Sequence, residues 1–191
     1  MPFASNDRLR VANAVPDGIE DTSASSDAAP MVELIELFFF AYRDFVGDAD
    51  RLLAPHGFGR AHHRVLHFVM RQPGLAVAEL LDILRITKQS LNRVMKDLVD
   101  QDCIAVQPGV SDRRQRLLYA TPKGRRLALD LAGVQSQRFE SVFGTLPAGA
   151  REAAQQFLLA VVDREGRDAV RARLVPGTLP ARLTIAAGRS A

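Results

Sequence analysis

Two short helical segments joined by only three residues limit the fold of this chain more than any other feature. They lie in the stretch AVAELLDILRITKQSLNRVMKDLVDQDCIAV, which begins at Ala76. The spacing of its apolar residues predicts helices at 76–84 and 88–101. The link between them is Arg85-Ile86-Thr87, and Thr87 is a favourable N-cap because its hydroxyl can accept a hydrogen bond from a free backbone N–H. The pair is therefore predicted to form a helix-turn-helix.

A β-hairpin is predicted directly after these helices. CIAVQ and LLYA are short β-like runs, and Pro108-Gly109 starts the turn between them. The tip of the hairpin, Gly109 to Arg114, carries a cluster of arginines. Thr121-Pro122 then begins a long helix to about Phe143, with proline at the first helical position, where its missing N–H costs nothing.

Helices are also predicted on both sides of this central part. Apolar residues at three- and four-residue steps predict a first helix over 32–53, which Pro55 and Gly57 end, and a second over 60–70. Pro147 opens a last helix that runs to about Leu174. The predicted fold class is therefore mainly α, with a two-stranded β-hairpin.

Positive charge is concentrated in one segment. Residues 85–126 hold ten lysines and arginines against four aspartates, a net charge of +6, whereas the formal net charge of the whole chain is only +3. A basic segment on an otherwise acidic chain indicates a polyanionic partner. Because the chain has one cysteine and no apolar run near the roughly 18 residues of a membrane span, we expect it to be soluble, away from membranes and cytoplasmic.

The second helix of the predicted helix-turn-helix has side chains suited to double-stranded DNA. In this motif the second helix lies in the major groove, where its first residues approach base edges. Gln and Asn can bind adenine and Arg can bind guanine through two hydrogen bonds, whereas Lys contacts phosphate. The candidate DNA-binding residues of this helix are Thr87, Lys88, Gln89, Ser90, Asn92, Arg93 and Lys96.

An ordinary solvated helix surface would also explain these polar residues. The hairpin decides between the two interpretations, because arginines at a hairpin tip can reach the adjacent minor groove and the phosphate backbone. We therefore add Arg113, Arg114 and Arg116 to the candidate DNA-binding residues. The hairpin is interpreted as the wing of a winged helix-turn-helix.

Two motifs resemble those of the MarR family of winged helix-turn-helix transcriptional regulators. The first, ITKQSLNRVMKDL from Ile86 to Leu98, is similar to the family's recognition helix in its hydroxyl cap, its second hydroxyl residue three positions later, and the Arg and Leu that follow. The second, Asp112-Arg113-Arg114 followed by Thr121 and Gly124, is similar to the wing pattern Asp-x-Arg leading to Leu-Thr-x-x-Gly, with Ala120 in place of that Leu. The resemblance covers roughly residues 32–174.

The resemblance implies a homodimer, joined by its first and last helices, that represses transcription from a palindromic operator until a small effector binds. Family effectors are often aromatic or phenolic, and for this chain we expect a small aromatic or acidic compound. By resemblance, His62, His63 and Phe39 are candidate ligand-binding residues, and Asp112 pairs with a nearby Arg to stabilise the wing.

These implications divide the chain into five parts. They are a disordered tail at 1–30, a dimerisation helix at 31–58, a winged helix-turn-helix DNA-binding domain at 59–124, C-terminal dimerisation helices at 125–175, and a flexible tail at 176–191. The predicted fold class thereby becomes a mainly α winged helix-turn-helix with a helical dimerisation part.

Two other chemical roles are weaker. His63 and His67 have the i, i+4 spacing that can bind zinc, but no cysteine or carboxylate motif accompanies them, so neither a metal site nor a cofactor is predicted. Burial as a small hydrophobic residue is the default for Cys103, and redox sensing is the alternative.

Two other classes of function compete with a DNA-binding regulator. A winged helix can serve as a protein-interaction module without DNA binding, but such modules usually carry an apolar or mixed surface on the second helix. An enzyme is not predicted, because the sequence has no phosphate-binding loop, nucleophile elbow, zinc-protease motif or dinucleotide fingerprint. Salt-dependent binding to duplex DNA would separate the regulator from both alternatives.

Overall fold

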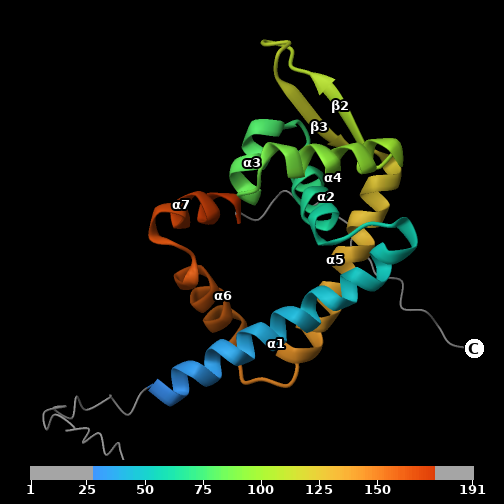
Figure 1. Cartoon of the computed structure of the whole chain (residues 1–191). Coiled ribbons are helices and arrows are strands. Elements are labelled where there is room, and N and C mark those ends of the chain that lie inside the picture. Colours follow the sequence, from blue (N-terminus) through green and yellow to red (C-terminus); the bar gives the residue numbers. More distant parts are fainter. Residues whose placement is uncertain (1–27, 175–191) are drawn as a thin grey trace, which may run out of the picture. The chain divides into compact units, whose positions relative to one another are not determined.

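A computed structural model describes residues 28–174 of the chain (Figure 1). The predictions of a disordered tail over 1–27 and a flexible tail after 175 lie outside these residues. The chain divides into two compact units, residues up to Phe38 and residues from Phe39 onward. Apart from the first turns of α1, all elements described below belong to the second unit.

The first two helices lie where they were predicted. α1 (Ala28–Leu53) begins a turn earlier than expected and includes three residues that were assigned to the N-terminal tail. The 3-10 turn η1 (Ala54–His56) ends it, and Gly57, with φ 67°, reverses the chain direction. α2 (Arg60–Arg71) buries Val65, Leu66 and Val69 among its inner residues.

The helix-turn-helix is confirmed. α3 (Val77–Leu84) and α4 (Lys88–Asp100) are separated only by Arg85, Ile86 and Thr87. The Thr87 hydroxyl oxygen accepts a hydrogen bond from the backbone N–H of Ser90 (3.2 Å), so Thr87 is the N-cap of α4. Arg85 follows α3 in the left-handed conformation, with φ 49°.

Within residues 28–174 the sheet has three strands rather than the predicted two. β2 (Ile104–Pro108) and β3 (Arg116–Ala120) form the antiparallel hairpin, and β1 (Leu75–Ala76) pairs with the other edge of β3. The N–H of Gly74 (φ 83°) donates to the Leu118 carbonyl (2.9 Å) and directs the chain along β3. Two residues are too few to produce the alternating pattern of a strand, which is why the sequence did not reveal β1.

Residues 122–174 include three helices, where two were predicted. α5 (Pro122–Phe143) has the expected bounds, but the single last helix is wrong: α6 (Ala150–Val161) and α7 (Arg164–Arg173) replace it. Arg167 donates to the carbonyls of Ala160 and Val162 (2.8 and 3.0 Å). A side chain of α7 thus satisfies carbonyl groups that the break leaves without helical partners.

One aliphatic core within residues 28–174 joins the end of α1, α2, the helix-turn-helix, the sheet and α5. Its largest fully buried side chains come from the helix-turn-helix and from both sides of it: Leu53, Leu66, Leu75, Leu80, Leu91, Leu98, Ile104, Leu118 and Leu131. Cys103 is also fully buried, as expected, and burial raises the pKa of its thiol. Within residues 28–174, none of the helices has the length and hydropathy needed to cross a membrane.

The start of α5 packs directly on the start of β2. Thr121 donates its backbone N–H to the Cys103 carbonyl (3.1 Å), and its hydroxyl oxygen accepts from the N–H of Gly124 (3.0 Å). A Cβ on Gly124 would lie 1.9 Å from the same Cys103 carbonyl oxygen. Only glycine therefore allows the helix and the strand to approach this closely.

Replacing Gly124 with alanine is expected to destabilise the fold by about 2 kcal/mol or more, because the backbone of β2 must move away. Gly133→Ala in the same helix is the control, since nothing lies within 4 Å of the added Cβ and alanine favours a helix by up to about 1 kcal/mol. Thermal and urea unfolding of both variants measure the difference. Equal stability of the two variants would contradict the close approach.

Candidate nucleic-acid interface

The exposed face of α4 carries the side chains that the sequence singled out. Leu91, Val94 and Leu98 are buried, whereas Met95 is only partly buried. All candidate residues of this segment are exposed, namely Thr87, Lys88, Gln89, Ser90, Asn92, Arg93 and Lys96. The amphipathic pattern of α4 therefore places amides and cations on its exposed face.

The wing arginines occupy two different places. Arg113 and Arg114 lie in the exposed turn between the strands, whereas Arg116 is the first residue of β3 and pairs with Pro108. Figure 1 shows β2 and β3 extending as a hairpin beyond α4. Nothing in this hairpin covers the three guanidinium groups, since each residue is exposed.

Asp112 holds the wing turn through the backbone and not through an arginine side chain. Its Oδ1 accepts a hydrogen bond from the N–H of Arg114 (2.9 Å), and its carbonyl accepts from the N–H of Gln115 (3.0 Å). Among the ion pairs of residues 28–174, none includes Asp112. The predicted pairing with an Arg side chain is therefore corrected: an aspartate reaches the N–H two residues ahead more readily in a tight turn.

A groove of about 480 Å³ separates α4 from the strands of the wing. Asn92 and Lys96 line it from α4, and Arg116 lines it from β3. Lys96 forms an ion pair with Asp100, and this hydrogen bond raises the pKa of Lys96. Two of the predicted cations and one predicted amide thus meet at one groove, together with an aspartate that the sequence analysis did not select.

The three candidate ligand-binding residues have different surroundings. Phe39 is 65% exposed on α1. Both ring nitrogens of His62 are used within the protein, by the N–H of Gly59 and by the carboxylate of Asp97. His63 is half-buried, and burial lowers its pKa. Residues 28–174 contain no group of three His, Cys, Asp or Glu side chains placed to hold a metal ion.

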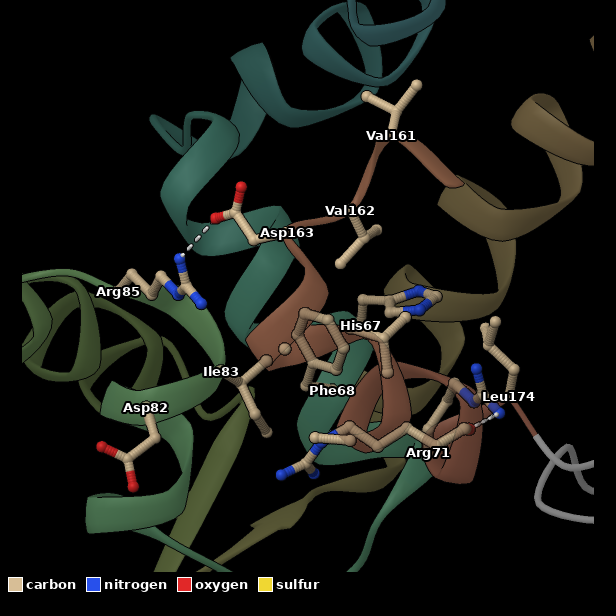
Figure 2. A pocket seen from close by; sticks show the side chains of 14 residues that line it. His67, Phe68, Arg71, Asp82, Ile83, Arg85, Val161, Val162, Asp163 and Leu174 are labelled. Carbon is tan, nitrogen blue, oxygen red and sulfur yellow. Dashed lines mark hydrogen bonds and ion pairs between the residues drawn. The ribbon is translucent and has the colours of Figure 1, made fainter. Parts of the chain in front are cut away.

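A pocket of about 600 Å³ lies elsewhere, between α2 and α3 on one side and α6 and α7 on the other (Figure 2). His67 and Phe68 line it from α2, and Val162 lines it from the link between α6 and α7. Burial lowers the pKa of His67 to about 4, so its imidazole is neutral near pH 7. None of His62, His63 and Phe39 is among the lining residues.

Three guanidinium groups reach this pocket. Arg71 donates to the Arg173 carbonyl (3.1 Å), and Arg85 forms an exposed ion pair with Asp163 (3.3 Å), drawn as a dashed line in Figure 2. Arg71, Arg85 and Arg173 were not predicted from the sequence because they come from α2, the helix-turn-helix link and α7, which only the fold brings together.

Comparison with known proteins shows similarity to transcriptional regulators. The sequence model of the MarR family matches residues 56–115. The HTH-type transcriptional regulator PetP of Rhodobacter capsulatus is 43% identical over 129 residues, which are 68% of this chain and 78% of PetP.

Solved structures share the fold at lower identity. A mutant of E. coli MarR in complex with operator DNA matches with a TM-score of 0.57 and 18% identity, over 73% of this chain and 100% of that chain. BpsR of Bordetella bronchiseptica, whose DNA binding is regulated by 6-hydroxynicotinic acid, matches with a TM-score of 0.55 and 24% identity, over 69% of this chain and 99% of that chain. With the wing, the capped α4 and the similarity to PetP in place, this chain belongs to the MarR family of winged helix-turn-helix transcriptional regulators.

Proposed function

We propose that this regulator binds a palindromic operator as a homodimer and represses transcription until a small organic anion binds. The observation that carries the proposal is the groove between α4 and the wing, which Asn92, Lys96 and Arg116 line. A DNA strand can pass through this groove while α4 enters the major groove and the turn at Arg113 and Arg114 reaches the adjacent minor groove.

Exposed apolar side chains support the homodimer. On α1, Phe39, Phe40 and Tyr42 are each at least half exposed. α5 and α6 add Phe139, Val142, Phe157, Leu158 and Val161, each at least 45% exposed. A second copy of the chain would cover these side chains and would place two α4 helices on one face of the DNA, with half-sites about 34 Å apart.

The competing interpretation, a protein-interaction module, lacks support from α4. Its exposed face holds lysine, arginine, asparagine and glutamine, and Val99 is the large exposed hydrophobic residue on that helix. The E. coli MarR structure contains operator DNA. By similarity of fold, the same use of the helix and wing is proposed for this chain.

The pocket of Figure 2 supports an anionic effector. Arg71 and Arg173 are absent from the ion pairs of residues 28–174, and the surrounding walls are mostly apolar, with Phe68, Ile83 and Val162. A planar carboxylate matches the two N–H groups of a guanidinium, and an aromatic body matches the apolar wall. We therefore propose an aromatic carboxylate as effector, at this pocket and not at His62, His63 and Phe39.

Base readout and backbone contact should separate by mutation. The test compares two duplexes, one that the wild-type protein enriches from a random pool and a shuffled version of it. Gln89→Ala and Asn92→Ala are expected to lower the difference in binding free energy between these duplexes by about 1–3 kcal/mol per half-site. Arg114→Ala is expected to weaken binding to both duplexes and to reduce the slope of log K against log salt by about one for each subunit. Gel shifts at several salt concentrations measure both effects. An equal loss on both duplexes for every variant would count against base readout.

Removing the carboxylate that pairs with Lys96 should strengthen DNA binding. Asp100→Asn frees the Lys96 ammonium for phosphate and is expected to tighten binding to either duplex about threefold, in keeping with the roughly 0–1 kcal/mol of an exposed ion pair. Asp130→Asn makes the same change of charge on an exposed position of α5 and is the control. If both variants bind alike, net charge and not the groove sets the affinity.

The effector pocket can be tested with aromatic carboxylates. Benzoate and 6-hydroxynicotinate should raise the melting temperature and release the DNA, and Arg173→Gln should require about tenfold more of either compound. Arg171→Gln is the matched control, because Arg171 lies on the same helix but does not line the pocket. The same response from both variants would place the effector elsewhere.

A further inference from the structure

The C-terminal end of α4 is held by polar contacts to the first turn of α2 and to η1. His62 Nε2 lies 3.1 Å from Asp97 Oδ2, and the side-chain amide of Gln101 donates to the backbone carbonyl of His56 (2.8 Å). Asp97 and Gln101 are four residues apart and therefore lie on the same side of the helix end. Asn92 and Lys96 line the groove on the wing side.

His62 can make its bond to Asp97 in one tautomer only. The backbone N–H of Gly59 lies 3.1 Å from Nδ1, so this ring nitrogen must accept. The proton of the neutral imidazole is then on Nε2, which donates to Asp97. The ring stacks on Phe58 with centroids 4.7 Å apart, and the side chain is only 13% exposed. The contacts with Gly59, Asp97 and Phe58 together fix the orientation of the imidazole ring.

Asp97 pairs with His62 and not with Arg93, the arginine on its own helix. Arg93 lies one turn before Asp97, a spacing at which arginine and aspartate side chains commonly form an ion pair on a helix surface. In residues 28–174 Asp97 pairs with His62, and no ion pair includes Arg93. The guanidinium of Arg93 thus remains on the exposed face without a carboxylate of its own helix.

We propose that His62 is a positioning residue for DNA recognition, which orients α4 through Asp97 and keeps that carboxylate away from Arg93. The close-packed side chains of Leu91, Val94 and Leu98 hold the inner face of α4, and the bond to His62 adds a directional restraint near the end of the helix. This role rests on the proposed function of α4 in base readout. It assigns to His62 a task within the protein in place of effector binding.

Two amide substitutions separate the two bonds of the imidazole. The amide oxygen of His62→Asn can replace Nδ1 and accept from Gly59, whereas the amide nitrogen of His62→Gln can replace Nε2 and donate to Asp97. Both variants lose the stacking on Phe58, so that loss cancels in their comparison. His56→Asn removes a ring from the same stack (centroids 5.7 Å from Phe58) but no bond to α4, and it serves as the control.

The expected result is a difference in specificity and not only in stability. His62→Asn should reduce the affinity ratio between the enriched and the shuffled duplex at least fivefold, whereas His62→Gln and His56→Asn should stay within twofold of wild type. Hydrogen exchange of the α4 amides, measured without DNA, should be at least fivefold faster in His62→Asn than in His62→Gln. Melting temperatures of all variants verify that each is folded.

Each outcome decides the proposal. Equal affinity ratios for the Asn and Gln variants, with a wild-type protein that does select a duplex, would overturn the role of His62 and leave DNA binding intact. If wild-type protein selects no duplex, the proposed function fails, and hydrogen exchange then decides whether His62 orients α4. Faster exchange in His62→Asn supports the contact, and equal exchange in both variants overturns it.

Discussion

The pairing of β3 with both of its neighbours is the constraint on which the interface depends. Leu118 is fully buried at the centre of this strand, opposite Leu75 on one side and Val106 on the other. β1 leads directly into α3, and β2 is the other half of the wing. β3 therefore sets the position of the wing relative to the helix-turn-helix. The groove that Asn92, Lys96 and Arg116 line depends on the pairing of β3 with both β1 and β2. The cations contribute little to this framework, because exposed ion pairs are worth only about 0–1 kcal/mol.

Asp97 and Asp100, the two aspartates near the end of α4, pair with different partners on different sides of the helix. Asp97 turns towards the protein and meets His62, whereas Asp100 pairs with Lys96 at the edge of the groove. A carboxylate on a DNA-facing helix opposes phosphate, so its direction matters as much as its presence. In the free protein the Lys96–Asp100 pair lowers local charge, and DNA can replace Asp100 as the partner of Lys96. Asp97, by contrast, pairs with His62 and does not line the groove.

Local chemistry made much of this fold predictable from sequence. Thr87 and Thr121 are both N-caps as expected, since a threonine cap needs only the next turn of its own helix. The features that were missed depend on distant residues. β1 forms because Leu118 offers a pairing edge, and the break after α6 is held by Arg167 of the following helix. The same applies to the site: helical spacing placed Asn92 and Lys96 on the exposed face, but the partners of Asp97, Asp112 and His62 follow from the geometry of the folded chain.

Arg85 connects the proposed effector pocket with α4 over a short distance. It occupies the left-handed conformation at φ 49°, which costs a non-glycine residue about 1 kcal/mol, in a link where glycine would avoid that cost. Its guanidinium reaches Asp163, and a Cβ on Gly166 would lie only 3.3 Å from its Nη2. The pair with Asp163 is exposed and therefore weak, so a carboxylate in the pocket can compete for Arg85. Because Arg85 stands two residues before the cap of α4, an effector that drew it away from Asp163 would act directly on the link between α3 and α4. The proposed regulation thus needs no long chain of contacts between ligand and DNA.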